Sequence, residues 1–107
     1  MRAMNLNTEQ FNNLLDAGKT LLLDFWAPWC VYCRRISAAY AKLAEQYGDK
    51  LVIAKINIDD EPEAANQEQI NVIPTLVLYQ GGETVASIVA PESKAKIEEF
   101  LRDHLDL

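Results

Sequence analysis

Two long apolar runs, TLLLDFWA at residues 20–27 and LVIAKINI at residues 51–58, flank a segment with helical periodicity. Runs of this kind are typical of strands that are buried on both faces of a sheet. Between them, Ile36, Tyr40 and Leu43 recur at the spacing of one helical face. Two strands that are joined by such a helix pair in parallel through a right-handed crossover. The chain is therefore expected to have an α/β architecture.

Periodicity and turn signals predict the remaining elements. Further helices are expected from Asn7 or Thr8 to about Ala17, from Pro62 onward and over residues 97–105, and further strands at 75–79 and 84–89. The last two strands are separated by QGGE, whose glycines favour a tight turn and hence an antiparallel pair. The expected result is a mixed sheet with helices on both faces. Because the 107 residues contain no repeat and no linker, residues 1–107 are expected to form a single domain.

The charge and hydropathy of the chain argue against several classes of function. The formal net charge is −6 and the pI is near 4.6, whereas a surface that binds nucleic acid needs an excess of lysine and arginine. No apolar run approaches the roughly 20 residues that span a bilayer, so no membrane association is expected. The N-terminal MRAMNLNTEQ lacks the apolar core of a secretory signal, which predicts a cytoplasmic protein. A mature periplasmic chain whose signal had been removed would look the same.

Both cysteines of the chain lie in FWAPWCVYCRR, residues 25–35, with only Val31 and Tyr32 between them. In a reducing cytosol, two cysteines are more often catalytic or metal-binding than a structural bridge. A structural zinc site needs four ligands, whereas the chain offers two cysteines and one histidine, His104, far along the sequence. We therefore expect no metal site, although an ion bridged between two chains is an alternative that the composition leaves open.

The spacing of the two cysteines suits reversible disulfide exchange. Cys30 falls at the junction between the first apolar strand and the following helix, where free backbone N–H groups and the helix dipole favour a thiolate. Cys33 follows about one helical turn later, close enough to attack a sulfur that is bound to Cys30. A structural bridge is a poor explanation, because closing so short a loop removes little chain entropy. The pair is therefore expected to open a partner's disulfide through Cys30 and to resolve the mixed disulfide through Cys33.

Two segments resemble the thioredoxin family. DFWAPWCVYC resembles the active-site segment of the family, NVIPTLVLY resembles the segment that carries its cis-proline, and the order of elements is similar from about Leu6 to the C-terminus. The resemblance implies the thioredoxin fold, in which a central mixed sheet of four to five strands is flanked by helices on both faces. It also implies a thiol–disulfide oxidoreductase of the protein-disulfide reductase type.

The same resemblance implies the partners of the chain. Its substrates would be disulfide-containing proteins. A flavoprotein thioredoxin reductase that consumes NADPH would recycle the oxidised form, and the chain itself would hold no cofactor. A monomer is expected.

Asp24 lies within the apolar run LLLDFW, where an ionised carboxylate is costly to bury unless it finds a partner. By resemblance it matches the family's buried acid beneath the resolving cysteine, and it would exchange a proton with Cys33 through a neighbouring water. Lys55, in IAKINI, matches the lysine that lies near this acid. The catalytic residues implied by the resemblance are therefore Cys30, Cys33, Asp24 and Lys55.

The resemblance also implies a docking surface for the substrate, formed by Trp29, Ile73, Pro74 and Ala90. Trp29 directly precedes Cys30 and would cover the site. The Ile73–Pro74 bond is expected to be cis because of the resemblance, since cis bonds are uncommon even before proline. The backbone of Ile73 would then pair with an extended segment of the substrate. Ala90 would lie beside the docking groove.

The sequence departs from the family pattern at several positions. Val31-Tyr32 replaces the usual Gly-Pro between the cysteines, and Ala90-Pro91 replaces Gly-Ala. The N-terminus is several residues shorter, which leaves the presence of a first edge strand open.

Two other functions remain as alternatives. Tyr32 is shared with many glutaredoxins, so one alternative is a glutaredoxin-like exchanger that uses glutathione as its reductant. The other is a thioredoxin-fold binding module that docks one dedicated partner on the surface around Trp29, Ile73 and Val89, with thiol turnover incidental.

Overall fold

The computed structural model describes residues 3–107, which build a five-stranded sheet with four helices. In chain order the elements are β1 (Met4–Asn5), α1 (Thr8–Asp16), β2 (Leu21–Trp26), α2 (Val31–Tyr47), β3 (Val52–Asn57), α3 (Pro62–Gln67), β4 (Thr75–Gln80), β5 (Glu83–Val89) and α4 (Lys94–His104). The strand order is β1-β3-β2-β4-β5. β1, β3 and β2 run parallel, whereas β4 is antiparallel to both of its neighbours, β2 and β5. The expected mixed α/β sheet is therefore confirmed.

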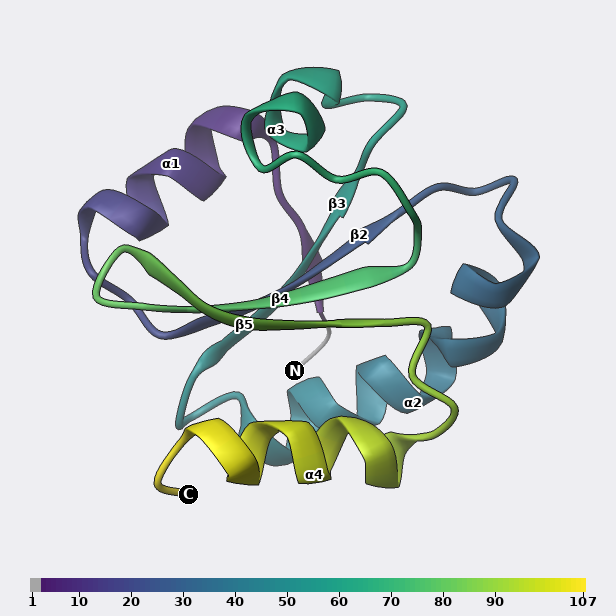
Figure 1. Ribbon diagram of the computed structural model, residues 1–107. Coiled ribbons are helices and arrows are strands. Elements are labelled where there is room, and N and C mark those ends of the chain that lie inside the picture. Colours follow the sequence, from purple (N-terminus) through teal and green to yellow (C-terminus); the bar gives the residue numbers. More distant parts are fainter. Residues whose placement is uncertain (1–2) are drawn as a thin grey trace.

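Helices cover both faces of the sheet, α2 and α4 on one side and α1 and α3 on the other (Figure 1). Successive residues of β2 point to opposite faces, so Leu22 packs with α2 and α4 while Leu21 and Leu23 pack with α1 and α3. β2 is the central strand, and its apolar side chains are completely buried from Leu21 to Phe25. Within residues 3–107, no helix is long and apolar enough to cross a bilayer.

Local sequence signals explain where the elements begin and end. Asn7 caps α1 through a capping box, in which its side chain accepts from the Gln10 backbone and the Gln10 side chain accepts from the Asn7 backbone. Gly81 and Gly82 connect β4 to β5, and both have a positive φ, as a tight hairpin turn requires. The expected antiparallel hairpin is confirmed.

The first edge strand, which the sequence left open, is present. Met4 pairs with Ala54 and Asn5 with Lys55 in a parallel register. The Asn5 side-chain oxygen also accepts a hydrogen bond from the Trp26 indole nitrogen at 3.0 Å. This short strand therefore covers the edge of β3 and reaches the end of β2.

The topology brings four segments of the chain together at one end of the sheet, where the central strand finishes (Figure 1). β2 and β3 are parallel, so both finish at this end of the sheet, and their register sets Asp24 beside Lys55. β4 begins at the same end, because Thr75 pairs with Phe25, and β5 finishes there, because Val89 pairs with Thr75. The carboxyl end of the central strand is thus the place where distant sequence segments can form a site.

Candidate active site

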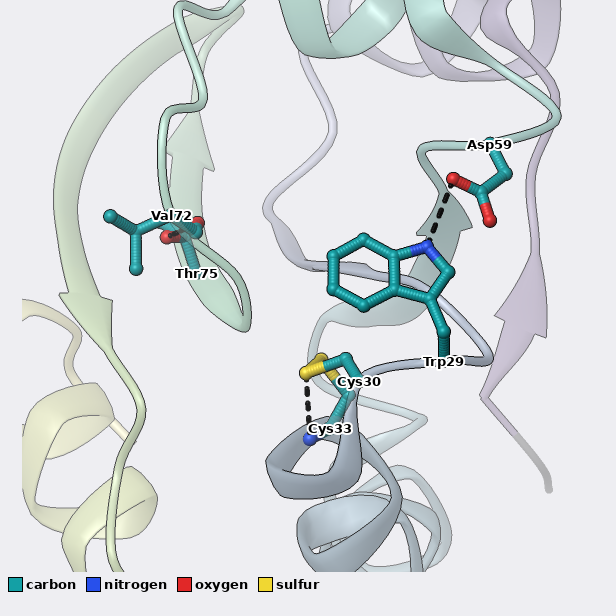
Figure 2. Close-up of a disulfide and its surroundings, with 6 residues drawn as sticks. All are labelled: Trp29, Cys30, Cys33, Asp59, Val72 and Thr75. Atoms are coloured by element: carbon teal, nitrogen blue, oxygen red, sulfur yellow. Dashed lines mark hydrogen bonds between the residues drawn. A yellow bond between two sulfur atoms is a disulfide. The ribbon is translucent and has the colours of Figure 1, made fainter.

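The two cysteines lie at the N-terminus of α2 and form a disulfide (Figure 2). Their Cα atoms are 5.2 Å apart, within the usual range for protein disulfides. Both side chains are buried, so only a small part of Cys30 reaches the surface. The structure is therefore that of the oxidised protein.

A tight turn joins β2 to α2 and makes Cys30 the N-cap of the helix. The Cys30 N–H donates to the Ala27 carbonyl at 3.1 Å, and the Cys30 carbonyl accepts from the Arg34 N–H at 3.2 Å. The Cys30 Sγ accepts a hydrogen bond from the Cys33 N–H at 3.2 Å (Figure 2). An N-cap oxygen usually accepts this bond. After reduction, the same N–H and the dipole of the 17-residue helix would stabilise a thiolate on Cys30.

Asp24 lies in the middle of β2, with 3% of its surface exposed. Among the described residues, its Oδ1 has no hydrogen-bond partner. Burial penalises the charged form and raises the pKa of Asp24 to about 7, although the positive charge of Lys55 opposes this rise. The carboxyl group can therefore both hold and release a proton near neutral pH.

A cavity of about 160 Å³ connects Asp24 to Cys33, and Lys55 also lines it. This volume is large enough for several water molecules. Lys55 is the register partner of Asp24 on β3, and its Nζ lies 4.3 Å from the centre of the Trp26 ring. The structure thus brings together the four residues that the resemblance implies as catalytic.

The loop before β4 faces the disulfide, as Figure 2 shows for the segment that carries Val72 and Thr75. The Ile73–Pro74 peptide bond is cis, which confirms the expectation. The Thr75 hydroxyl donates to the Val72 carbonyl at 2.5 Å. The Pro74 carbonyl accepts from the Ala90 N–H at 2.9 Å, so the two loops that carry Pro74 and Ala90 are bonded to each other.

Exposed apolar side chains gather at the segments that meet around the disulfide. Trp29 is 64% exposed, and its indole N–H donates to the Asp59 carboxylate at 3.2 Å (Figure 2). Val31, Val72 and Val89 each expose more than half of their surface. We call Trp29, Val31, Val72 and Val89 the apolar rim. Exposed apolar groups that cluster in this way are typical of an interaction surface.

A family model named Thioredoxin matches residues 2–103. The chain belongs to the thioredoxin family. A thioredoxin from Alicyclobacillus acidocaldarius subsp. acidocaldarius is 37% identical over 102 residues, which cover 95% of this chain and 97% of that protein. A thioredoxin from Acidithiobacillus ferridurans is 40% identical over 93 residues, which cover 87% of this chain and 86% of that protein. A bifunctional thioredoxin reductase/thioredoxin from Mycobacterium leprae is 37% identical over 93 residues, which cover 87% of this chain and 20% of that protein.

Family membership and the cysteine pair together establish the class of reaction. The mixed sheet with helices on both faces is the thioredoxin fold. The disulfide occupies the Cys-Val-Tyr-Cys segment at the start of α2. The chain is therefore a thiol–disulfide oxidoreductase of the protein-disulfide reductase type.

Sequence reasoning did not single out Asp59 or Val72. A signal for Asp59 existed, because it follows the end of β3 by two residues and parallel strands end at a common edge of the sheet. No sequence signal indicates the exposure of Val72, since it depends on how the loop before β4 is bonded to its neighbours. Both residues belong to the surface of the thioredoxin site.

Proposed function

We propose that the chain reduces disulfides of other proteins by a two-step exchange, and the disulfide at the start of α2 is the observation that carries this proposal. The Cys30 thiolate attacks one sulfur of the substrate disulfide, forms a mixed disulfide and releases the first substrate thiolate. Cys33 then loses its thiol proton, attacks the Cys30 Sγ and releases the second substrate thiolate. Two electrons pass to the substrate, and the cysteine pair is left as a disulfide.

Asp24 is proposed to take the proton of Cys33 through water in the cavity that the two residues line. A base works best when its pKa is near the working pH, and the pKa of Asp24 is about 7. Lys55 is proposed to assist, because its charge lowers the pKa of Asp24 and so keeps a larger fraction of the carboxyl group ionised.

Trp29, Ile73, Pro74 and Ala90 are proposed to contact the substrate. The hydrogen bond between Ala90 and Pro74 and the position of the loop opposite the disulfide support this role. An extended segment that pairs with the Ile73 backbone would present its disulfide to Cys30. The apolar rim would bury apolar side chains of the substrate around it.

The proposed electron donor is an NADPH-dependent flavoprotein thioredoxin reductase, and the chain itself carries no cofactor. The relative from Mycobacterium leprae, whose name joins a thioredoxin reductase to a thioredoxin, supports this pairing. We further propose that the chain acts in the cytoplasm, as a monomer and as a single domain over residues 1–107.

A binding module is the second candidate, and the exposed apolar rim favours it. Such a module would dock a dedicated partner without using its thiols. It would keep its cellular role when both Cys30 and Cys33 are replaced by serine. A reductase would lose its role in the same double variant.

The test of the proposed function is insulin reduction, followed as NADPH oxidation in the presence of thioredoxin reductase. The unaltered chain is expected to turn over, and Cys30→Ser is expected to abolish the reaction. Cys33→Ser is expected to stop after one step, with a mixed disulfide on Cys30 that mass spectrometry detects. Turnover by either variant would contradict the exchange. Turnover that requires glutathione and glutathione reductase instead would identify the glutaredoxin-like alternative.

A further inference from the structure

Tyr32, between the two cysteines, is bonded to a segment 59 positions further along the chain. Its hydroxyl group donates to the Pro91 carbonyl at 3.2 Å, and its ring is half-buried against the core beneath α2 and α4. Tyr32 belongs to the first turn of α2, and Pro91 lies in the connection from β5 to α4. The helix that carries the cysteines is therefore tied directly to this connection.

The connection is held at two adjacent residues. Ala90 donates its N–H to the Pro74 carbonyl at 2.9 Å, and Pro91 accepts from Tyr32. Ala90 has a φ of +46°, in the left-handed region that residues other than glycine seldom adopt. A residue in this conformation persists only when its surroundings hold it there, and such residues concentrate at functional sites. Within residues 3–107, Gln69 is the one other non-glycine residue with a positive φ.

The connection that carries Ala90 and Pro91 lies on the side of the disulfide where the substrate is proposed to bind. It directly follows the exposed Val89 of the apolar rim and is bonded to the loop before β4. A protein substrate that reaches Cys30 between these loops would contact the connection, whereas a small disulfide needs little more than the sulfur of Cys30. A loop that is already held rigid loses less conformational freedom when a substrate binds to it.

We propose that Tyr32 is a positioning residue. Its hydroxyl group holds the backbone of Ala90 and Pro91 in the conformation that contacts the extended segment of a protein substrate. This inference rests on the proposed function, since it assumes that protein disulfides reach Cys30. It assigns to Tyr32 a role in selecting macromolecular substrates and no part in the transfer of electrons or protons.

Tyr32→Phe tests this role, because it removes the hydroxyl group and keeps the ring in the core. The matched control is Tyr47→Phe, which removes a hydroxyl group that donates to Glu98 at the other end of the same helix. We expect Tyr32→Phe to raise the KM for insulin about 2- to 10-fold, the range that the loss of one net hydrogen bond allows. The kcat with insulin should change less than twofold, and the rate constant with a small aromatic disulfide should fall less than the kcat/KM for insulin.

Amide hydrogen exchange of Ala90 in the oxidised protein provides a second readout. Exchange should become about 2- to 10-fold faster in Tyr32→Phe, and it should not change in Tyr47→Phe. An unchanged KM for insulin would overturn the positioning role, whether or not the exchange accelerates. Equal losses with insulin and with the small disulfide would also overturn it, because Tyr32 would then act on the chemistry. If the unaltered chain failed to reduce insulin, the proposed function would fail, and the role of Tyr32 would fail with it.

Discussion

Replacement of Asp24 by asparagine is expected to stabilise the oxidised protein above neutral pH and to destabilise it in acid. Asp24 is 3% exposed, and its Oδ1 finds no partner in the described part of the chain. Asparagine keeps the size of the side chain and removes the charge. Any dependence on pH that disappears in Asp24→Asn therefore belongs to this carboxyl group.

The magnitude follows from the pKa of Asp24, which rises from 3.8 to about 7 on folding. Between these values the unfolded chain has released a proton that the folded protein still holds, so the free energy of unfolding falls as the pH rises. The free energy of unfolding falls by about 1.4 kcal/mol per pH unit in this range. The loss of stability is therefore absent below pH 3.8 and reaches about 4 kcal/mol above pH 7. The amide of Asp24→Asn has to be desolvated when it is buried, which brings a cost of about 1–3 kcal/mol that does not depend on pH.

Urea unfolding of the oxidised protein between pH 4 and 9 checks this prediction. The difference in unfolding free energy, Asp24→Asn minus unaltered, should rise by about 4 kcal/mol from pH 4 to pH 8 and then level off. Asp49→Asn is the control, because Asp49 is exposed and its replacement should change stability by less than about 0.5 kcal/mol. A difference that stays constant across the whole range would mean that the pKa of Asp24 does not rise on folding.

Three further predictions concern other groups. Gly82→Ala should lower the free energy of unfolding by about 2–4 kcal/mol, because a Cβ at Gly82 would lie 2.9 Å from a carbonyl oxygen of α1. Gly81→Ala should cost about 1 kcal/mol, because Gly81 also has a positive φ but a Cβ there would meet open space. Equal losses of stability in the two variants would contradict this prediction. Tyr40→Phe should cost about 1–2 kcal/mol in the same assay, because the one hydrogen of the buried hydroxyl group is donated between two strand carbonyl oxygens, which lie 2.7 and 2.9 Å away. An unchanged midpoint would count against this prediction. The rate at which Cys33 resolves the mixed disulfide can be measured by stopped-flow fluorescence. This rate should increase as the pH rises through about 7, and the increase should be lost in Asp24→Asn. An identical pH profile in both proteins would mean that Asp24 takes no part in the proton transfer.

The central part of the fold could be predicted from local patterns. The apolar runs and the helical spacing between them specify β2, α2 and β3, because burial on both faces of a strand and on one face of a helix leaves a clear periodicity. The resemblance, rather than the apolar run itself, indicated that Asp24 would be buried, whereas the position of Cys30 at a strand-to-helix junction indicated the start of a helix. The cis bond before Pro74 was expected from the resemblance alone, because the local residues favour trans.

Local sequence patterns could not predict the contacts across the site, because these contacts depend on register and loop geometry. The bond from Tyr32 to Pro91 joins residues 59 positions apart, and no local pattern specifies it. The proximity of Lys55 to Asp24 was expected from the resemblance alone, since a shift of one residue in the register turns every side chain of a strand to the other face. Exposure of Val72 likewise depends on the shape of its loop. Sequence patterns therefore identified the reacting groups better than they identified the surface around them.

The equilibrium reduction potential of the Cys30/Cys33 pair tests most directly whether this pair is a reversible donor of two electrons to protein disulfides. The titration would use glutathione and dithiothreitol couples, with mass spectrometry to count the thiols at each step. We expect one two-electron transition, with a potential more reducing than that of the glutathione couple. A markedly oxidising potential, or a disulfide that does not equilibrate with either couple, would contradict a role as a protein-disulfide reductase.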